Sequence, residues 1–239
     1  MIQIRYIGTG EAFDHRLPNT SMVYEGERRI LIDCGYAVPH ALWSHSRDPN
    51  WLDAIYLSHF HADHCFGLPA LLARMGEDGR ERSLTIFGGP GSKEATNTVL
   101  QTGYPRMLEK LPFPLEQVEI PPESPARFGA LTLKVAQSHH SVPNYSLRIE
   151  EDTMSLCYSG DGGPSEATQA LFSGCSLLIH EAYHPELQTK QSHASVPQVM
   201  AMAKQLRVEQ LHLIHLKRDA PLPTGATVPV PGQIYLLKG

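Results

Sequence analysis

The sequence predicts an α/β protein in which two mixed β-sheets stack face to face and helices cover both outer faces. Two observations support this fold class. Runs of residues typical of strands and of helices alternate along the chain, as in α/β proteins. Hairpins at residues 21–33 and 145–158 interrupt that alternation. A single parallel sheet would not contain such hairpins, so the mixture indicates two sheets with helices outside.

Length and composition are those of an ordinary soluble globular protein. The chain has 239 residues, of which 41% are hydrophobic and 19% charged, so it can bury a sizeable core. No Ser/Gly-rich linker or block of charge marks a boundary, and residues 1–239 are expected to form one domain. The formal net charge of -5 excludes a global cationic field that would gather nucleic acid.

The N-terminal sequence and the cysteines indicate the compartment. The four cysteines are irregularly spaced and contain no CxxC pair, which is typical of reduced thiols. Neither a signal peptide nor an apolar run of roughly 18 residues is visible. The sequence therefore predicts a cytoplasmic protein without membrane contact.

In the N-terminal half, strands are expected to alternate with helices. The alternation of Ile2, Ile4 and Tyr6 predicts a first strand, which ends in the turn Gly8–Gly10. Residues 21–24 and 29–33 predict a hairpin. The further elements expected here are a helix at 36–45, a strand at 53–58, a helix at 67–75, a strand at 84–87, and a helix at 93–100 with Ser92 as its N-cap.

The second half begins with a proline-rich stretch. Prolines multiply between Gly103 and Pro125, which predicts an irregular surface segment over or near the opening of a site. The elements expected after it are strands at 131–136, 145–150, 154–158, 176–179, 211–216 and 233–237, a helix from near Ser165, and a helix at 196–206 capped by Ser195.

Histidines and a carboxylate cluster directly after the strand at 53–58. Within the six consecutive positions 59–64, four are His59, His61, Asp63 and His64. In an extended segment His59 and His61 point the same way, because side chains alternate with period two. Imidazole nitrogen and carboxylate oxygen are ligands that zinc and similar ions accept, and this spacing lets two ions share one loop. A solvated histidine-rich loop is the competing, less favoured interpretation.

Three later strands also end at side chains that could bind a metal. His139 and His140 follow the strand at 131–136, Asp161 follows that at 154–158, and His215 lies at the end of that at 211–216. Side chains at strand ends can converge although they are far apart in sequence. Together these residues supply enough ligands for a pair of ions.

These blocks together resemble the metallo-β-lactamase superfamily, and within it the ribonuclease Z branch. The matching blocks are His59-x-His61-x-Asp63-His64 with Gly67-Leu68, Ser159-Gly160-Asp161, Ile179-His180-Glu181-Ala182, Ser192-His193-Ala194 and Leu213-Ile214-His215. They occur in the family's order and span nearly the whole chain. The resemblance implies the four-layer αββα metallo-β-lactamase fold.

The resemblance also implies which residues bind the metals. The implied ligands are His59, His61 and His140 for one ion, Asp63, His64 and His215 for the other, with Asp161 bridging both. His139 competes with His140. We favour His140 because the family's ligand precedes an Arg-Ile pair by eight residues, here Arg148-Ile149. The expected cofactor is a pair of divalent ions, zinc in the first place, with manganese or iron as alternatives.

The implied chemistry is attack by a metal-bridging hydroxide on a phosphodiester. By this analogy Asp63 holds the remaining proton of the hydroxide while it binds metal. Glu181 and His193 would together protonate the leaving alkoxide. The alternative role for these two residues is a cap or a hydrogen bond that orients a ligand.

Three departures from ribonuclease Z argue for a different substrate. The family's PxKxRN loop is replaced by residues 12–19, its transfer-RNA-gripping arm is not recognisable between Gly91 and Leu131, and its closing His-x-Ser-x-Arg is changed to residues 215–219. Fewer groups that grip phosphate should weaken binding to a polyanion. We therefore expect a small-molecule or nucleotide diester as substrate, in preference to transfer-RNA 3′-processing.

Two alternatives to this activity stay open. The same hydroxide could hydrolyse a lactone, a thioester or another carboxyl ester. A degenerate, noncatalytic family member is disfavoured by the complete ligand set. A homodimer is expected by analogy with the family alone.

Overall fold

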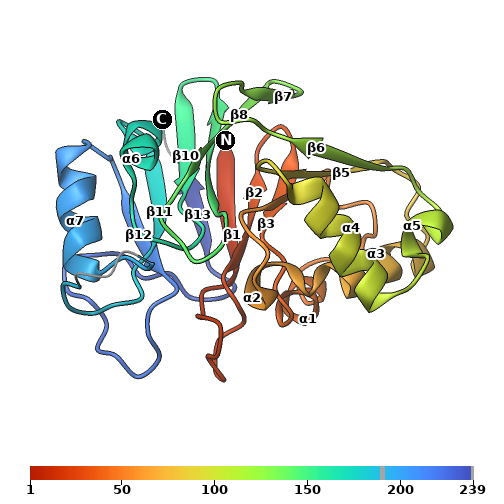
Figure 1. Cartoon of the computed structure of the whole chain (residues 1–239), viewed down its shortest axis with the longest axis horizontal. Helices are drawn as coiled ribbons and strands as arrows, with labels where there is room; N and C mark the ends of the chain where they lie inside the picture. The colour runs from red at the N-terminus through yellow and green to blue at the C-terminus, as the bar shows by residue number, and fades with distance from the viewer. Residues whose placement is uncertain (189–191, 238–239) are drawn as a thin grey trace.

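Two β-sheets stacked face to face, with helices on both outer sides, make up the architecture of the chain (Figure 1). The structure is a computed structural model that describes residues 1–188 and 192–237. The predicted α/β class with four αββα layers is confirmed.

The first sheet has the strand order β13-β1-β2-β3-β4-β5-β6 in the described residues. Pairing is antiparallel from β13 to β3 and parallel from β3 to β6. Its strands are β1 (Ile2–Gly8), β2 (Ser21–Glu25), β3 (Arg29–Ile32), β4 (Ala54–Leu57), β5 (Leu84–Gly88), β6 (Leu115–Glu119) and β13 (Ile234–Leu237).

The second sheet repeats this division in the order β12-β11-β10-β9-β8-β7. Pairing is parallel from β12 to β10 and antiparallel from β10 to β7. Its strands are β7 (Ala126–Phe128), β8 (Leu131–Gln137), β9 (Tyr145–Glu151), β10 (Met154–Tyr158), β11 (Leu177–Glu181) and β12 (Leu211–Ile214).

Helices separate into two groups, one for each sheet. The helices on the side of the first sheet are α1 (Val38–Trp43), α2 (Ala62–Cys65), α3 (Leu68–Glu77), α4 (Ser92–Gly103) and α5 (Met107–Lys110). Those of the second sheet are α6 (Glu166–Phe172) and α7 (Val196–Gln205). Ser195 caps α7 as predicted, because it accepts from the Gln198 amide, and Ser165 likewise caps α6 by accepting from the Thr168 amide. Among the described helices, none combines the length and the apolar character that crossing a bilayer requires.

Each central strand packs against two layers, because its side chains alternate between the two faces of the sheet. In β3, Ile30 and Ile32 pack between the two sheets, whereas Leu31 packs under the outer helices. In β4, Tyr56 faces the inner layer and Ile55 the helices. Each central strand is therefore apolar on both sides, as buried sheets require.

Two expectations from the sequence are wrong. The stretch 103–125 is not irregular, because it contains α5 and the edge strand β6, and none of its described residues lines the pocket of the site described below. Two of its prolines, Pro114 and Pro121, fall just outside β6, where they remove no ladder hydrogen bond. Ser92 lies within α4, and Gly91, at φ +85°, occupies the N-cap without a side-chain hydrogen bond.

Candidate metal centre

The predicted ligands meet at one end of the two sheets, where β4, β8, β10 and β12 finish. His59 and His61 follow β4, and Asp63 and His64 lie on the short helix α2. The side chains contributed by the second sheet are His140 after β8, Asp161 after β10 and His215 after β12. Strand ends thus supply every group, although the chain positions differ by more than 150 residues.

One ligand group consists of His59, His61, His140 and Asp161. One nitrogen or oxygen atom from each of these residues lies within 4.8 Å of those from the other three. His61 Nδ1 is 3.1 Å from His59 Nε2 and 3.2 Å from His140 Nε2. Lone pairs of three imidazoles thus converge on one point, an arrangement that a cation stabilises.

The other ligand group consists of Asp63, His64, His215 and again Asp161. His64 Nε2 lies 3.2 Å from Asp63 Oδ2 and 3.4 Å from Asp161 Oδ1. His215 Nε2 lies 3.4 Å from Asp161 Oδ2. Because Asp161 belongs to both groups, it could hold a cation together with the residues of either one.

Two unsatisfied atoms test whether these residues fit a metal. His64 Nε2 and Asp161 Oδ1 are buried, and neither has an aligned hydrogen bond to any of the described residues. An unpaired buried polar atom costs about 1–3 kcal/mol, and more when charged. Divalent metal ions would satisfy both atoms, so the donor set fits such ions.

Asp33 orients His64, a residue of the second ligand group, and the sequence did not indicate this role. The fully buried carboxylate accepts hydrogen bonds from His64 Nδ1 at 2.7 Å and from the hydroxyls of Ser58 and Tyr158 at 2.7 and 2.6 Å. A carboxylate on Nδ1 leaves Nε2 as the ligand nitrogen and increases its basicity. The only sequence signal for this role was a carboxylate at the end of β3, next to the strand that carries the histidines.

The other ligand histidines are also oriented through their second nitrogen. His140 Nδ1 donates to the Ser192 carbonyl at 2.8 Å. His215 Nδ1 is 3.4 Å from Thr20 Oγ1, and the His215 amide donates to the Thr9 carbonyl. Such contacts fix the ring orientation and the tautomer.

Asn144 fixes the loop of the shared carboxylate and was also missed. Its side chain is fully buried, accepts from the Asp161 amide at 3.2 Å and donates to the Ser159 carbonyl at 3.0 Å. A Cβ atom at Gly160 would lie only 2.2 Å from the Asn144 oxygen, which explains the glycine before Asp161.

His139 and His140 are placed differently. His140 joins the first ligand group. His139 is exposed, and its backbone forms a bridge with Gly163. The geometry therefore favours the choice of His140.

Glu181, which is buried, and His193, which is half-buried, form a pair beside the predicted ligands. Glu181 Oε1 accepts from His193 Nδ1 at 3.1 Å and from the Gly162 and Ala194 amides at 2.9 Å. Its Oε2 accepts from the Tyr183 amide at 2.9 Å. Both oxygens are thus engaged, which suits a carboxylate that orients His193 better than one that itself transfers a proton.

The pKa values of the histidines at this site are shifted in different directions. Burial lowers the pKa of His59 well below its ordinary value, and neighbouring His64 adds to this effect. Burial also lowers the pKa of His64, but Asp161 and Asp33 outweigh it and raise that pKa. Burial likewise acts against protonation of His193, yet its bond to Glu181 raises the net pKa. Neighbouring carboxylates thus favour positive charge on His64 and His193, whereas burial disfavours it on His59.

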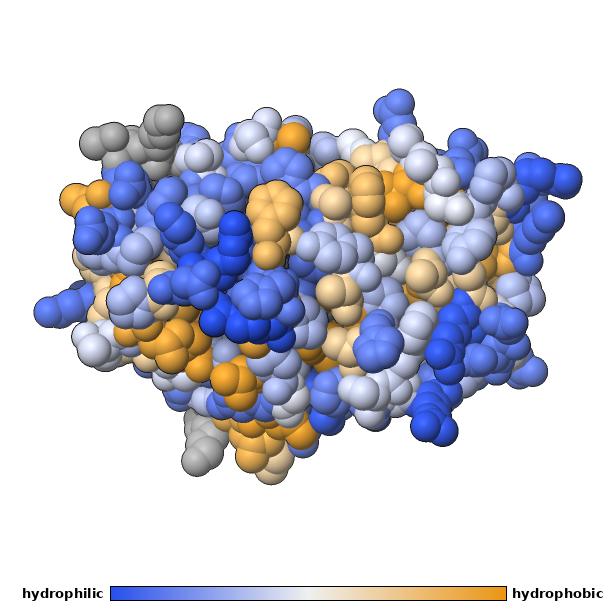
Figure 2. Space-filling view, turned by 90° about the horizontal axis from the view of Figure 1, so that it is seen from below, coloured by the Kyte–Doolittle hydropathy of each residue, from blue (hydrophilic) through white to orange (hydrophobic). Residues whose placement is uncertain are grey.

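The centre opens into a pocket of about 430 Å³. Besides ligand residues, the pocket is lined by Glu11, Phe13, Tyr36, Tyr183 and His193. It lies at the end where the β1–β2 loop projects, and the view from that side shows separate hydrophobic patches on a hydrophilic surface (Figures 1 and 2).

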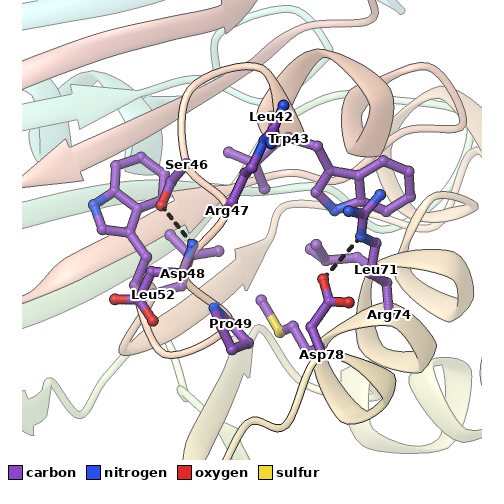
Figure 3. Close-up of a pocket in the computed structure, with 12 residues that line it drawn as sticks. Leu42, Trp43, Ser46, Arg47, Asp48, Pro49, Leu52, Leu71, Arg74 and Asp78 are labelled. Atoms are coloured by element: carbon purple, nitrogen blue, oxygen red, sulfur yellow. Dashed lines mark hydrogen bonds and ion pairs between the residues drawn. The ribbon is translucent and has the colours of Figure 1, made fainter.

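A second hollow near α1 and α3 offers no comparable chemistry. It is lined by residues such as Trp43 and Arg74, and its volume is only about 30 Å³ (Figure 3). Arg74 there pairs with Asp78 at 2.9 Å. The hollow holds about one or two waters, so it is not a site for a substrate.

Comparisons with known proteins agree with this geometry. The family described as "Anti-Pycsar protein Apyc1" matches residues 2–227. Ribonuclease Z from Methanosarcina acetivorans is 25% identical over 90% of this chain and 88% of its own length. The metallo-β-lactamase fold protein YhfI from Bacillus subtilis superposes with a TM-score of 0.82 at 21% identity, covering 98% of each chain. Human tRNase Z, short form, gives 0.81 at 19% identity over 99% of each.

The comparisons confirm two expectations from the sequence. The chain has the metallo-β-lactamase fold, and it is similar to the ribonuclease Z branch over most of its length.

Proposed function

The chain belongs to the family of the anti-Pycsar protein Apyc1 and is a metal-dependent hydrolase of the phosphodiesterase type, and from this premise we propose that it cleaves a small nucleotide phosphodiester. The observation that carries the proposal is the pair of ligand groups that share Asp161. We propose zinc for both ions, because imidazole with carboxylate is a usual zinc donor set.

When bound, two such ions supply a hydroxide at neutral pH and stabilise negative charge on the phosphoryl oxygens. The protein's own part is to hold the ligands and to manage protons. We propose that Asp63, a member of the second ligand group, accepts the proton of the nucleophile. His193 lines the pocket, and with its Nδ1 fixed by Glu181 it can deliver a proton from Nε2 to the leaving alkoxide.

The surroundings of the pocket favour a small substrate over transfer RNA. Two arginines near the pocket residues are already paired with carboxylates: Arg218 contacts Glu11, which lines the pocket, and Arg16, on the loop between β1 and β2, lies 3.3 Å from Asp219. The span from 91 to 131, where the family's basic arm would lie, is instead occupied by α4, α5, β6 and β7. Few cations are therefore left to neutralise a long phosphate backbone.

A substrate panel on one preparation tests the proposal. The zinc-loaded protein is assayed with bis(p-nitrophenyl) phosphate, cyclic and linear dinucleotides, cyclic mononucleotides, a precursor transfer RNA, an aryl ester and a lactone, while bound metal is counted by elemental analysis. We expect hydrolysis of the small diesters with two metals per chain. Turnover of only the ester or the lactone would replace the proposal with a carboxyl-ester hydrolase, and preferred cleavage of the transfer RNA would replace it with an endonuclease.

Two structural expectations stay predictions. We propose that residues 1–239 fold as one domain and that the protein forms a homodimer, as inferred by analogy. Light scattering coupled to size-exclusion chromatography measures the mass of the protein in solution. A mass of one chain would contradict the homodimer.

A further inference from the structure

The β1–β2 loop, residues 9–20, is built rigidly around a buried carboxylate. Glu11 is 1% exposed, and its Oε2 accepts from the Phe13 amide at 2.9 Å while its Oε1 pairs with Arg218. Asp14 Oδ1 accepts from the Arg16 amide at 2.8 Å. The Tyr36 hydroxyl donates to the Ala12 carbonyl. These contacts hold the backbone on both sides of Phe13.

Phe13 is nevertheless exposed. Its side chain is 74% accessible to solvent and belongs to none of the three apolar clusters formed by the described residues. Packing therefore does not explain this aromatic ring, which stands on a loop otherwise tied down by hydrogen bonds. A rigidly held and uncovered aromatic side chain is suited to receive a flat partner.

The location of the ring specifies that partner. Phe13 and Tyr36 line the same pocket as the ligands His61, Asp63 and His215. The Arg218 guanidinium lies 6.0 Å from the centre of the Phe13 ring, which supports the ring through a cation–π contact. A molecule with its phosphate at the ligand groups would extend its other end along this aromatic side of the pocket.

We infer that Phe13, supported by Arg218 and Tyr36, is the stacking platform for the nucleobase of the substrate. This inference rests on the proposed function, because it takes the ligand groups as the place of the phosphate. Every base offers a π-face, so stacking gives affinity for nucleotides with little preference among bases. Phe13 thereby selects nucleotide diesters over diesters without a base.

Binding of two simple probes separates stacking from phosphate recognition. Adenosine 5′-monophosphate and ribose 5-phosphate are titrated calorimetrically into the zinc-loaded protein, the Phe13→Ala and Phe13→Tyr variants, and the control Tyr104→Ala. Tyr104 is 51% exposed and lies outside the pocket of the metal centre, so it matches Phe13 in exposure alone. Both sites are at the surface, and all variants should fold and retain their metal.

We expect the wild-type protein to bind the nucleotide about 5- to 150-fold more tightly than the sugar phosphate, the range that stacking of one base supplies. Phe13→Ala should abolish this difference and leave the affinity for ribose 5-phosphate unchanged. Phe13→Tyr and Tyr104→Ala should both preserve it.

Two outcomes overturn the inference while leaving the proposed function intact. One is equal affinity of the wild-type protein for the two probes; the other is a Phe13→Ala variant that still prefers the nucleotide. A Phe13→Ala variant that loses affinity for both probes would show a structural role of Phe13 and also overturn it. Failure of the proposed function looks different, since neither probe would bind and bis(p-nitrophenyl) phosphate would not be hydrolysed.

Discussion

Asp33 lies directly behind His64, with its Oδ2 2.7 Å from the Nδ1 atom of the imidazole whose Nε2 belongs to the second ligand group. The pair joins residues 31 positions apart and is completely buried. It therefore links the basicity of a ligand nitrogen to a carboxylate that does not itself enter either ligand group.

Replacing Asp33 by Asn should weaken metal binding without removing a ligand. The amide lacks the charge that makes His64 Nε2 a better donor, and loss of such a partner typically costs about 10- to 100-fold in metal affinity. Competition with a chromogenic chelator measures this constant. The control is Asp53→Asn, because Asp53 belongs to neither ligand group and instead pairs with Arg82 at a distance of 2.5 Å. Equal zinc affinity of the Asp33 variant and the wild type would contradict this role.

Replacing His61 by Ala should remove one ion and the activity together. His61 Nδ1 stands between His59 Nε2 and His140 Nε2, so its loss leaves the first group incomplete. We expect elemental analysis to fall from two metals per chain towards one, and hydrolysis of bis(p-nitrophenyl) phosphate to fall at least about 100-fold. A variant that keeps two metals would remove His61 from the ligand set.

Replacing His193 by Ala should slow turnover but spare the metals. The residue contacts Glu181 and the pocket and belongs to neither ligand group. General acid catalysis contributes about 10²- to 10⁴-fold, so kcat should fall in that range at unchanged metal content. His184→Ala is the matched control, because the His184 ring lies 6.4 Å from that of His193 but does not line the pocket. An unaffected kcat in the His193 variant would exclude it as the proton donor.

Replacing Arg80 by Met should destabilise the fold. The side chain is 1% exposed, and its guanidinium donates to carbonyls at Pro49, Leu52, Arg82 and Ser83, while burial lowers its pKa to about 10. Methionine fills the volume but leaves these acceptors without donors, at a cost of about 3 kcal/mol in the free energy of unfolding. Urea denaturation measures the loss.

The control for Arg80 is the exposed Arg106, which pairs with Glu109 at the surface. Arg106→Met should change the free energy of unfolding by at most about 0.5 kcal/mol. Similar losses in the two variants would show that the buried hydrogen bonds contribute little.

His212 should make the fold sensitive to acid. Burial lowers its pKa from the ordinary 6.5 to about 4, and its Nδ1 lies 2.6 Å from the Tyr6 hydroxyl. The unfolded chain therefore binds the proton first, so the stability that neutral His212 contributes is complete above pH 6.5 and declines as the pH falls towards 4. By this linkage the wild type loses about 2 kcal/mol at pH 5 relative to pH 7.5.

His212→Gln isolates this contribution because glutamine does not titrate. The difference in free energy of unfolding between wild type and variant, measured with chelator present throughout, should shrink by about 2 kcal/mol between pH 7.5 and pH 5. A difference that stays constant with pH would show that His212 is not the responsible group.

Local patterns in the sequence predicted much of the fold and the position of the site. Alternating residues in Ile2–Gly8 identified a strand, and the histidines after β4 stood where the ligand groups are found. The edge strand β6 was missed because its sequence, Leu115–Glu119, is only partly buried and stands among prolines. Its pairing with β5 depends on a sheet that is complete only in three dimensions.

The supporting residues of the site could not be predicted for a similar reason. Asn144 and Asp33 are ordinary polar residues in the sequence, and their importance comes from contacts with Asp161 and His64. The contact between Glu11 and Arg218 spans 207 positions. A single sequence carries no signal for pairs so distant along the chain.

The ligand set is divided between the two sheets, since the loop after β4 supplies His59 to His64 and the second sheet supplies His140, Asp161 and His215. Neither half offers a complete set by itself, so high affinity for metal arises only when the halves are assembled. Ions that bind the assembled state alone raise its apparent stability with their concentration. We therefore expect the supply of metal to set how much of the folded protein persists as well as how fast it works.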